Sequence, residues 1–420
     1  MEKPSKRIYL CLAHMSESGL EQKYIKEAFD TNWVVPLGPN VNAFEEDLKN
    51  FVGQDKEVVA LSAGTAAIHL ALIACGVQPG DEVCVQSFTF CASSHPIKYL
   101  GATPIFIDSE EDTWNMDPAL LEEAIKDRMA KTGRKPKAII PVALYGMPYQ
   151  IDRIMEIADR YDIPVIEDAA EGFGSRYGGR ALGTFGRFGV LSFNGNKMIT
   201  TSGGGALICP DAETKNKIMW YATQAREAYP YYQHEAIGYN YRLSNICAGI
   251  GRGQMTVANE HIEHHRHIAE MYRKAFEDIE GVTFHDEMGR GEAFSNFWLC
   301  TITLDTHLRI KGQENAYGKA ITGAVGGAAG VVHQTAALTT DCQPDDNVEA
   351  LRMFMDAAGI EVRPLWKPMH KQPVYHDCPA YLNGVSEALF KKGMCLPSGP
   401  CVTDDDVRYI IDCIKNAIEK

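Results

Sequence analysis

The stretch SFNGNKMITTSGGG, residues 192–205, places a single lysine, Lys197, in a polar segment between the apolar run GVLSF and three glycines. A lysine in a partly desolvated site loses its proton more readily and can form a Schiff base with an aldehyde. Ser192 and a neighbouring turn are suited to hold a phosphate at the other end of such an aldehyde. The stretch therefore indicates a lysine that takes part in chemistry.

A second chemical signal is Asp168, which follows the apolar run IPVI. We expect this carboxylate to be buried, which is costly unless a cation meets it. A protonated ring nitrogen of a cofactor would be such a cation. Capping of the following turn by Asp168 is the alternative interpretation.

The third signal is SAGTAA, residues 62–67, where Gly64 permits a tight turn and Thr65 opens a predicted helix. Backbone N–H groups and the helix dipole at such a point suit a phosphate, although the pattern alone is equally typical of a simple helix cap. Phe90, in SFTFCASS, is placed to stack on a ring or to join the core. An aldehyde, a phosphate and a ring nitrogen together describe pyridoxal 5'-phosphate (PLP).

The elements that must position these residues alternate along the chain. Apolar runs rich in β-branched residues predict strands at 57–62, 81–87, 103–108, 137–144, 163–168 and 188–193. Apolar residues at helical spacing predict helices at 65–76, 91–101, 117–129 and 151–162. This order indicates an α/β fold with a mostly parallel sheet covered on both faces. Ligands bind beyond the carboxyl ends of such strands, so the three polar clusters should converge.

The second half of the chain has a different pattern. Residues 242–279 predict one long helical passage out of the large domain, and short strands such as 297–304 and a closing helix at 403–420 follow. We therefore expect a large domain over 1–270 and a smaller C-terminal α+β domain over 271–420. Residues 311–346, rich in Gly and Ala, are interpreted as an insertion or a mobile loop.

The composition argues against a membrane-spanning protein and against a nucleic-acid-binding protein. The 420 residues are 45% hydrophobic and 23% charged, and no apolar run is long enough to span a membrane. Twelve scattered cysteines without a Cys-x-x-Cys pair, and no convincing export signal, predict a cytoplasmic protein. A net charge of −14 argues against nucleic acid, so an anionic ligand would need local donors.

The run HIEHHRH, residues 261–267, is the one candidate metal motif. Three of its histidines fall within about one helical turn, but no carboxylate or cysteine at matching spacing completes a site. We interpret the run as a solvated helix face and predict no metal.

Over nearly its full length, the chain resembles the DegT-type PLP-dependent sugar aminotransferases. The matching segments are SAGTAAIHLAL, SFTFCASS, IEDAAEGFGSRYGGRALGTFG, LSFNGNKMITTSGGGAL, GYNYRLSNICAGIG, EVRPLWKPMHKQPVY and CLPSG. The resemblance implies the aspartate-aminotransferase fold, PLP-dependent transferase fold type I, with a large domain and a smaller α+β domain.

The resemblance also implies roles for individual residues. Lys197 is the lysine that bonds to PLP, and Asp168 is the partner of the pyridinium nitrogen. Glu171 lies near the cofactor's phenolic oxygen, Phe90 stacks on the ring, and Gly64, Thr65 and Ser192 hold the phosphate. Asn240 reaches the cofactor phosphate of the neighbouring subunit, which implies a homodimer with shared active sites. Trp366 and His370 border the sugar-nucleotide pocket. Candidate diphosphate donors, without an assigned role, are Arg176, Arg180, Arg226 and Arg242.

The reaction implied is transfer of an amino group from glutamate to a keto carbon of a nucleotide-linked sugar. SFNGNKMITTSGGG and RPLWKPMH resemble the branch that aminates C4 of a UDP-linked 4-keto-6-deoxy-N-acetylhexosamine. A GDP- or dTDP-linked ketosugar is the alternative substrate. Two other functions remain open: PMP-dependent dehydration, which relatives with histidine in place of the lysine carry out, and PLP binding by a regulator without turnover.

Overall fold

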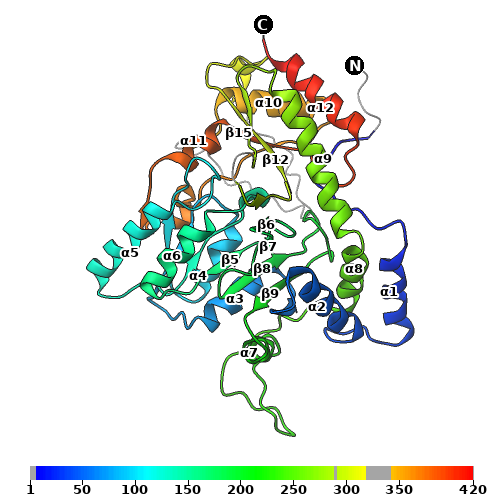
Figure 1. The fold of residues 1–420 in the computed structure, drawn as a ribbon, viewed down its shortest axis with the longest axis vertical. Coiled ribbons are helices and arrows are strands. Elements are labelled where there is room, and N and C mark those ends of the chain that lie inside the picture. Colours follow the sequence, from blue (N-terminus) through cyan, green and yellow to red (C-terminus); the bar gives the residue numbers. More distant parts are fainter. Residues whose placement is uncertain (1–5, 288–290, 318–341, 420) are drawn as a thin grey trace.

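The computed structural model describes residues 6–287, 291–317 and 342–419, and its centre is one continuous sheet (Figure 1). The strand order is β14-β3-β2-β4-β5-β8-β9-β1, and two bridges, Ile139 to Val165 and Val142 to Asp168, join its two halves. The strands are β1 (Glu57–Leu61), β2 (Glu82–Gln86), β3 (Thr103–Ile107), β4 (Ile139–Ile140), β5 (Ile166–Asp168), β8 (Phe188–Ser192), β9 (Gly205–Cys209) and β14 (Ala380–Tyr381).

The predicted mostly parallel sheet is confirmed. Neighbouring strands run parallel except around β9, which lies antiparallel to both β8 and β1. All six predicted strands are present, whereas β9, whose residues GALIC are buried on both faces, was not predicted. Two glycines precede this strand and a third, Gly205, begins it, which obscured its pattern.

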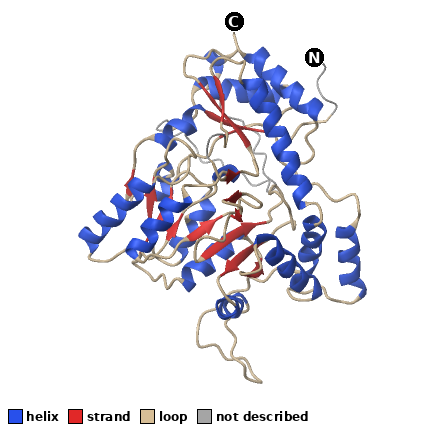
Figure 2. Ribbon diagram, viewed as in Figure 1, coloured by secondary structure: helices blue, strands red, loops and turns tan. Residues whose placement is uncertain are grey.

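Helices cover both faces of the sheet, as expected for strands that are apolar on both sides (Figure 2). One face packs against α2 (Pro39–Val52), α5 (Pro118–Thr132) and α6 (Ile151–Tyr161). The other packs against α3 (Gly64–Ala74), α4 (His95–Tyr99) and α7 (Ala212–Ala222). Successive side chains of β1 point to opposite faces of the sheet. Val58 packs in the first core, on the face covered by α2, and Val59 packs in the second core, on the face covered by α3. Asp117 caps α5 by accepting from Ala119 N–H.

The predicted single helix over 242–279 is two helices, α8 (Asn245–Met255) and α9 (Ala258–Phe276). The break falls at Thr256, whose hydroxyl donates to Gly253 O over 2.6 Å. The glycines of α8 allow it to pack closely on α1 (Leu20–Asp30) and α2. A Cβ on Gly253 would lie 2.6 Å from Glu21 Cγ, and one on Gly251 would lie 2.7 Å from the Phe44 ring. The hydrophobic pattern is continuous across the break and so gave no sign of it.

Helix α9 carries the chain to the part of the molecule that holds both termini (Figure 1). There an antiparallel sheet of order β10-β12-β15-β13 packs with α10 (Asp346–Ala357) and α12 (Asp404–Ala417) around a third core. The sheet's strands are β10 (Val282–Phe284), β12 (Cys300–Leu304), β13 (Arg363–Pro364) and β15 (Gly393–Leu396). The predicted boundary near residue 270 falls within α9 and stays a prediction.

Other segments complete the described chain. The helix α11 (Val385–Lys392) follows β14, and β6 (Arg176–Tyr177), β7 (Arg180–Ala181) and β11 (Ala293–Phe294) form a small sheet. Most of the predicted insertion at 311–346 lies outside the described residues. No helix of the described chain is long and apolar enough to cross a membrane.

Candidate functional site

A cavity of about 330 Å³ opens beyond the carboxyl ends of the central strands. All three polar clusters predicted to converge contribute to it: SAGTAA after β1, the residues after β5, and SFNGNK at the end of β8. Among the residues lining the cavity are Gly64, Thr65, Phe90, Asp168, Glu171, Ser192, Lys197, Trp298 and Trp366.

Lys197 lies in the turn after β8 with its side chain 13% exposed. Its backbone N–H donates to Asn194 O over 3.0 Å, which holds the turn. Its Nζ lies 3.6 Å from Oε1 of Glu171 and 3.9 Å from the centre of the Trp298 ring. The amine therefore lies close to both a carboxylate and an aromatic face inside the cavity.

Asp168 is buried at the end of β5, as predicted. Its Oδ2 accepts a hydrogen bond from Ser93 Oγ over 2.6 Å, and its Oδ1 accepts from Ala170 N–H over 3.1 Å. Burial raises the pKa of this carboxyl, and the Ser93 hydrogen bond opposes that shift. A cation beside Asp168 would stabilise its ionised form further.

Glu171 is also buried, with Oε2 accepting from the backbone N–H of Tyr145 over 2.7 Å. Burial raises the pKa of this carboxyl, while the charge of Lys197 lowers it. Tyr145 in turn accepts at Oη from the backbone N–H of Trp366 over 2.8 Å. One tyrosine thus links the carboxylate to an aromatic residue of the cavity wall.

The N-terminus of α3 also lines the cavity. Ala63 is extended and makes no side-chain cap, so the first N–H groups of the helix have no capping side chain. A Cβ on Gly64 would lie 3.3 Å from Ser192 Cβ, and one on Gly205 would lie 2.4 Å from Gly64 N. Backbone N–H groups and hydroxyls in this position form a site for an anion.

These donors fit PLP. An anion site, a lysine amine and a buried carboxylate line one cavity, matching the phosphate, aldehyde and ring nitrogen of the cofactor in kind. Phe90, 49% exposed, and Trp366 add aromatic surface, with ring centres 5.5 Å apart. The observation supports the sequence-predicted cofactor roles, which stay predictions for each residue.

Three predicted site residues lie outside this cavity. His370 Nδ1 lies 2.7 Å from Ser87 Oγ. Arg242, predicted as a substrate contact, has its guanidinium 3.2 Å from Glu45 Oε1, because a carboxylate as buried as Glu45 requires a cation. The structure therefore does not bring Arg242 to the candidate site. Asn240 is exposed and does not line this cavity.

The interpretation of 261–267 as a solvated helix face is wrong for two of its histidines. His261 and His265 are buried, with their Nδ1 atoms 3.2 Å from Met198 O and 3.1 Å from Phe297 O. Burial lowers the pKa of both, that of His265 to about 3, so they pack α9 as neutral rings. Among the residues described here, no group of three or more His, Cys, Asp or Glu is arranged to hold a metal.

Several residues of the site were not predicted from the sequence. Trp298 and Tyr145 contact predicted residues, and Ser93 binds Asp168, yet none of them carries a motif of its own. Of these, only Ser93 lay within a matching segment, SFTFCASS. The others come from distant parts of the chain and are joined to the site only by folding.

Comparison with known proteins agrees with this geometry. The model of the DegT/DnrJ/EryC1/StrS aminotransferase family matches residues 16–316 and 313–415. The protein EpsN of Bacillus subtilis (strain 168) is 46% identical over 413 residues, covering 97% of this chain and 95% of its own. GDP-perosamine synthase of Escherichia coli O157:H7 is 34% identical, covering 97% of this chain and 98% of its own.

Among solved structures, a DegT DnrJ EryC1 StrS aminotransferase from Brucella abortus superposes with a TM-score of 0.81. It is 26% identical and the match covers 96% of each chain. The similarity confirms the predicted fold over nearly the full length of the chain.

Proposed function

The chain belongs to the DegT/DnrJ/EryC1/StrS aminotransferase family, and from this premise we propose that it aminates a UDP-linked 4-keto-6-deoxy-N-acetylhexosamine at C4, with glutamate as donor. Family membership makes the protein a sugar-nucleotide aminotransferase with PLP as cofactor. The observation that carries the proposal for this chain is the cavity itself. Lys197, Asp168 and the uncapped N-terminus of α3 meet in it.

The cofactor residues act through position and charge. The first turn of α3 and the Ser192 hydroxyl would bind the phosphate, and Asp168 would hold the proton on the ring nitrogen. When bound, PLP supplies the aldehyde carbon that carries the amino group and the ring that takes up an electron pair. Ser93 keeps Asp168 oriented through its 2.6 Å hydrogen bond.

Lys197 has two tasks in this proposal. Its Nζ would bond to the cofactor's aldehyde carbon at rest. As a free amine it would accept the proton that leaves the donor's α-carbon, and in the second half of the cycle it would donate a proton to the sugar carbon that receives the amino group. Glu171, whose Oε1 lies 3.6 Å from Nζ, pairs with the ammonium that forms. The buried Trp298 ring covers the other side and limits water access to the amine.

We propose that the wall near Trp366 faces the sugar nucleotide, because Trp366 and Phe90 extend the cavity with aromatic surface. Preference for a UDP-linked sugar rests on the resemblance of residues 192–205 and 363–370. A GDP-linked 4-ketosugar is the second candidate. It is favoured by the 34% identity to a GDP-perosamine synthase over almost the whole chain.

We also propose a homodimer with shared active sites. Residues after α7 project away from the body of the molecule (Figure 1) and expose Tyr231, Tyr232 and Ile237 by 60%, 77% and 83%. Exposed apolar groups of this kind mark association surfaces. Asn240 is exposed at the end of the same segment, consistent with reaching a neighbouring subunit.

Twelve free cysteines support a cytoplasmic location, which we also propose.

The visible spectrum of the purified protein tests the function. The band of lysine-bound cofactor should bleach with glutamate and return on adding the UDP-linked ketosugar. Bleaching that returns only with the GDP-linked ketosugar would select the second candidate. Water release without aminated sugar would instead favour the dehydratase, and no response to any amino donor would favour the regulator.

A further inference from the structure

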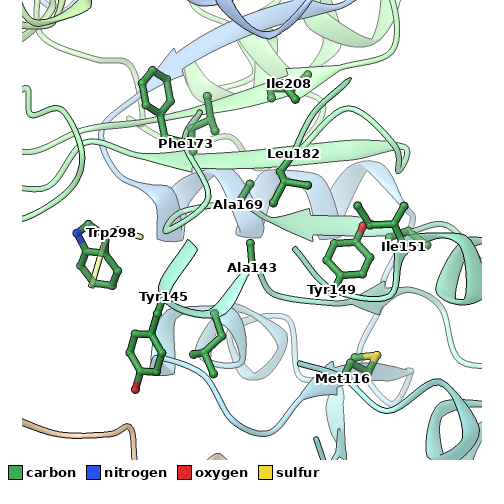
Figure 3. Close-up of a cluster of buried hydrophobic side chains, with 14 of the residues drawn as sticks. Met116, Ala143, Tyr145, Tyr149, Ile151, Ala169, Phe173, Leu182, Ile208 and Trp298 are labelled. Atoms are coloured by element: carbon green, nitrogen blue, oxygen red, sulfur yellow. The ribbon is translucent and has the colours of Figure 1, made fainter. Parts of the chain in front are cut away.

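Trp298 lies beneath the amine of Lys197 although the two residues are far apart in the sequence. Its side chain is buried, and the centre of its ring lies 3.9 Å from Nζ. Its indole N–H donates to Asn196 O over 2.7 Å, so it also contacts the turn that carries the lysine. In Figure 3, Trp298 and Tyr145 lie at one end of the apolar cluster that supports the site.

Hydrogen bonds on both sides fix the backbone of Trp298. Its N–H donates to Oδ1 of Asn296 over 2.8 Å, and its carbonyl accepts from Ser398 Oγ over 2.9 Å. The same Asn296 donates from Nδ2 to the carbonyls of Glu171 and Phe173, each over 2.9 Å. One buried asparagine therefore sets the position of both groups that flank the lysine amine.

We propose that Trp298 is a positioning residue for Lys197. Its ring face binds the Nζ ammonium, which Glu171 also contacts, and so helps to set the pH at which the amine becomes reactive. The proposal rests on the proposed function, in which Lys197 is the residue that bonds to PLP. An aromatic face attracts a cation and not a neutral amine, and the attraction is strongest for tryptophan and for desolvated pairs.

Other titratable groups face the same amine. The carboxylates of Glu171 and Asp168 both interact with its charge, as does the thiol of Cys11. Burial raises the pKa of the Cys11 thiol to about 12, so it stays neutral over the useful pH range. The two carboxylates remain in place when Trp298 is replaced, so a difference between Trp298 variants reports the ring.

The test uses cofactor-free protein and follows its condensation with PLP, in which the Nζ–carbon bond forms and water leaves. The rate is measured against pH by absorbance, and borohydride reduction with peptide mass spectrometry identifies the lysine. The variants are Trp298→Phe and Trp298→Leu. Both lose the indole N–H that binds Asn196 O, but only Phe keeps an aromatic face.

Loss of the ring removes stabilisation of the ammonium, so the amine becomes available at lower pH. We expect the midpoint of the rate profile to fall by about one pH unit in Trp298→Leu and by less in Trp298→Phe. Trp114→Leu is the matched control, because Trp114 is buried against His285 outside the cavity. Its midpoint should equal that of the wild type.

Three outcomes separate the proposals. Midpoints that fall in the order wild type, Trp298→Phe, Trp298→Leu support the role of the ring. Equal shifts in both variants, or a changed plateau rate with an unchanged midpoint, overturn it, since the hydrogen bond or simple packing would then account for the effect. Failure of the wild type to label at Lys197 would overturn the proposed function itself.

Discussion

Tyr145 adopts a φ of 53° and donates its backbone N–H to Oε2 of Glu171 over 2.7 Å. A side chain other than glycine is strained in this region, by about 1–3 kcal/mol, unless its surroundings hold it there. Here the next residue, Gly146, has a φ of 97°, and its carbonyl accepts hydrogen bonds from Ser175 and Ser295. The strained turn is therefore fixed by buried hydrogen bonds and aims an N–H at the carboxylate beside Lys197.

Replacement of Gly146 tests this turn. A Cβ there would lie 1.9 Å from Oδ1 of Asn296, in addition to the cost of its positive φ. We expect Gly146→Ala to lower the free energy of unfolding by more than about 3 kcal/mol, because the buried asparagine must move. Urea denaturation of the cofactor-free protein measures the loss.

Gly133→Ala is the control for that measurement. Gly133 has a φ of 70° at the end of α5, and a Cβ there would meet nothing within 4 Å. Gly133→Ala should therefore lower the free energy of unfolding only by the backbone strain, about 1–2 kcal/mol. Equal losses for the two variants would mean that crowding against Asn296 is unimportant.

Lys197→Ala should abolish covalent attachment of the cofactor and lower turnover more than about 10³-fold, because the same amine moves the proton. PLP should still bind through the α3 turn, Ser192 and Asp168. Equilibrium dialysis would detect that binding, and borohydride reduction followed by mass spectrometry would show no labelled lysine. Lys26→Ala, on the exposed surface of α1, should behave as the wild type. Substantial activity in Lys197→Ala would contradict the assigned role.

The sequence predicted the residues at the centre of the site because each of them lies at the end of a strand, and strands can be predicted from the local sequence pattern. Lys197, Asp168 and Gly64 each follow a strand of one parallel sheet, and strand ends converge wherever such a sheet forms. By contrast, Trp298 contacts Lys197 from a segment beyond α9, and its place depends on how α9 packs. No periodicity or motif encodes a contact between such distant segments.

One wrong prediction from the sequence arose from reading polarity as exposure. The charged run at 261–267 suggested solvent, yet His261 and His265 face carbonyls of the lysine turn and of the segment before Trp298. Polarity alone cannot distinguish a solvated histidine from a buried one whose ring finds a partner. Sequence patterns also do not show that Arg242, a candidate diphosphate donor, pairs with the buried Glu45; its role toward the substrate stays a prediction.

Asp168→Asn should change how stability depends on pH. Burial raises the pKa of the Asp168 carboxyl above its ordinary 3.8, so its contribution to stability is present below 3.8 and lost as the pH rises through the raised value. The asparagine side chain of the variant does not titrate. The unfolding free energy of the cofactor-free wild type, minus that of the variant, should therefore fall from acidic to neutral pH. The fall should be about 1.4 kcal/mol for each pH unit that separates the folded-state pKa from the unfolded-state pKa.

Chemical denaturation at a series of pH values measures that difference. Ser93→Ala should raise the pKa of Asp168 further, since it removes a hydrogen bond to the ionised form. The unfolding free energy of Ser93→Ala should accordingly fall more between acidic and neutral pH than that of the wild type. A difference between wild type and Asp168→Asn that stays constant with pH would mean that folding does not shift the pKa of Asp168, and a difference that rises with pH would mean that folding lowers it.

The proposed sharing of active sites between subunits predicts complementation between two inactive variants. Lys197→Ala and Asn240→Ala would each inactivate a homodimer, but in a mixed dimer one site carries both changes and the other carries neither. Random mixing after reversible dissociation should then restore about a quarter of wild-type activity, because half of the dimers are mixed and each has one intact site. Steady-state assays of separately purified and mixed variants measure this recovery.

Mixing Lys197→Ala with Asp168→Asn is the control, since both side chains line the cavity of one chain and no intact site can form. Recovery in neither mixture, with dimers confirmed by light scattering, would place Asn240 outside the neighbouring site.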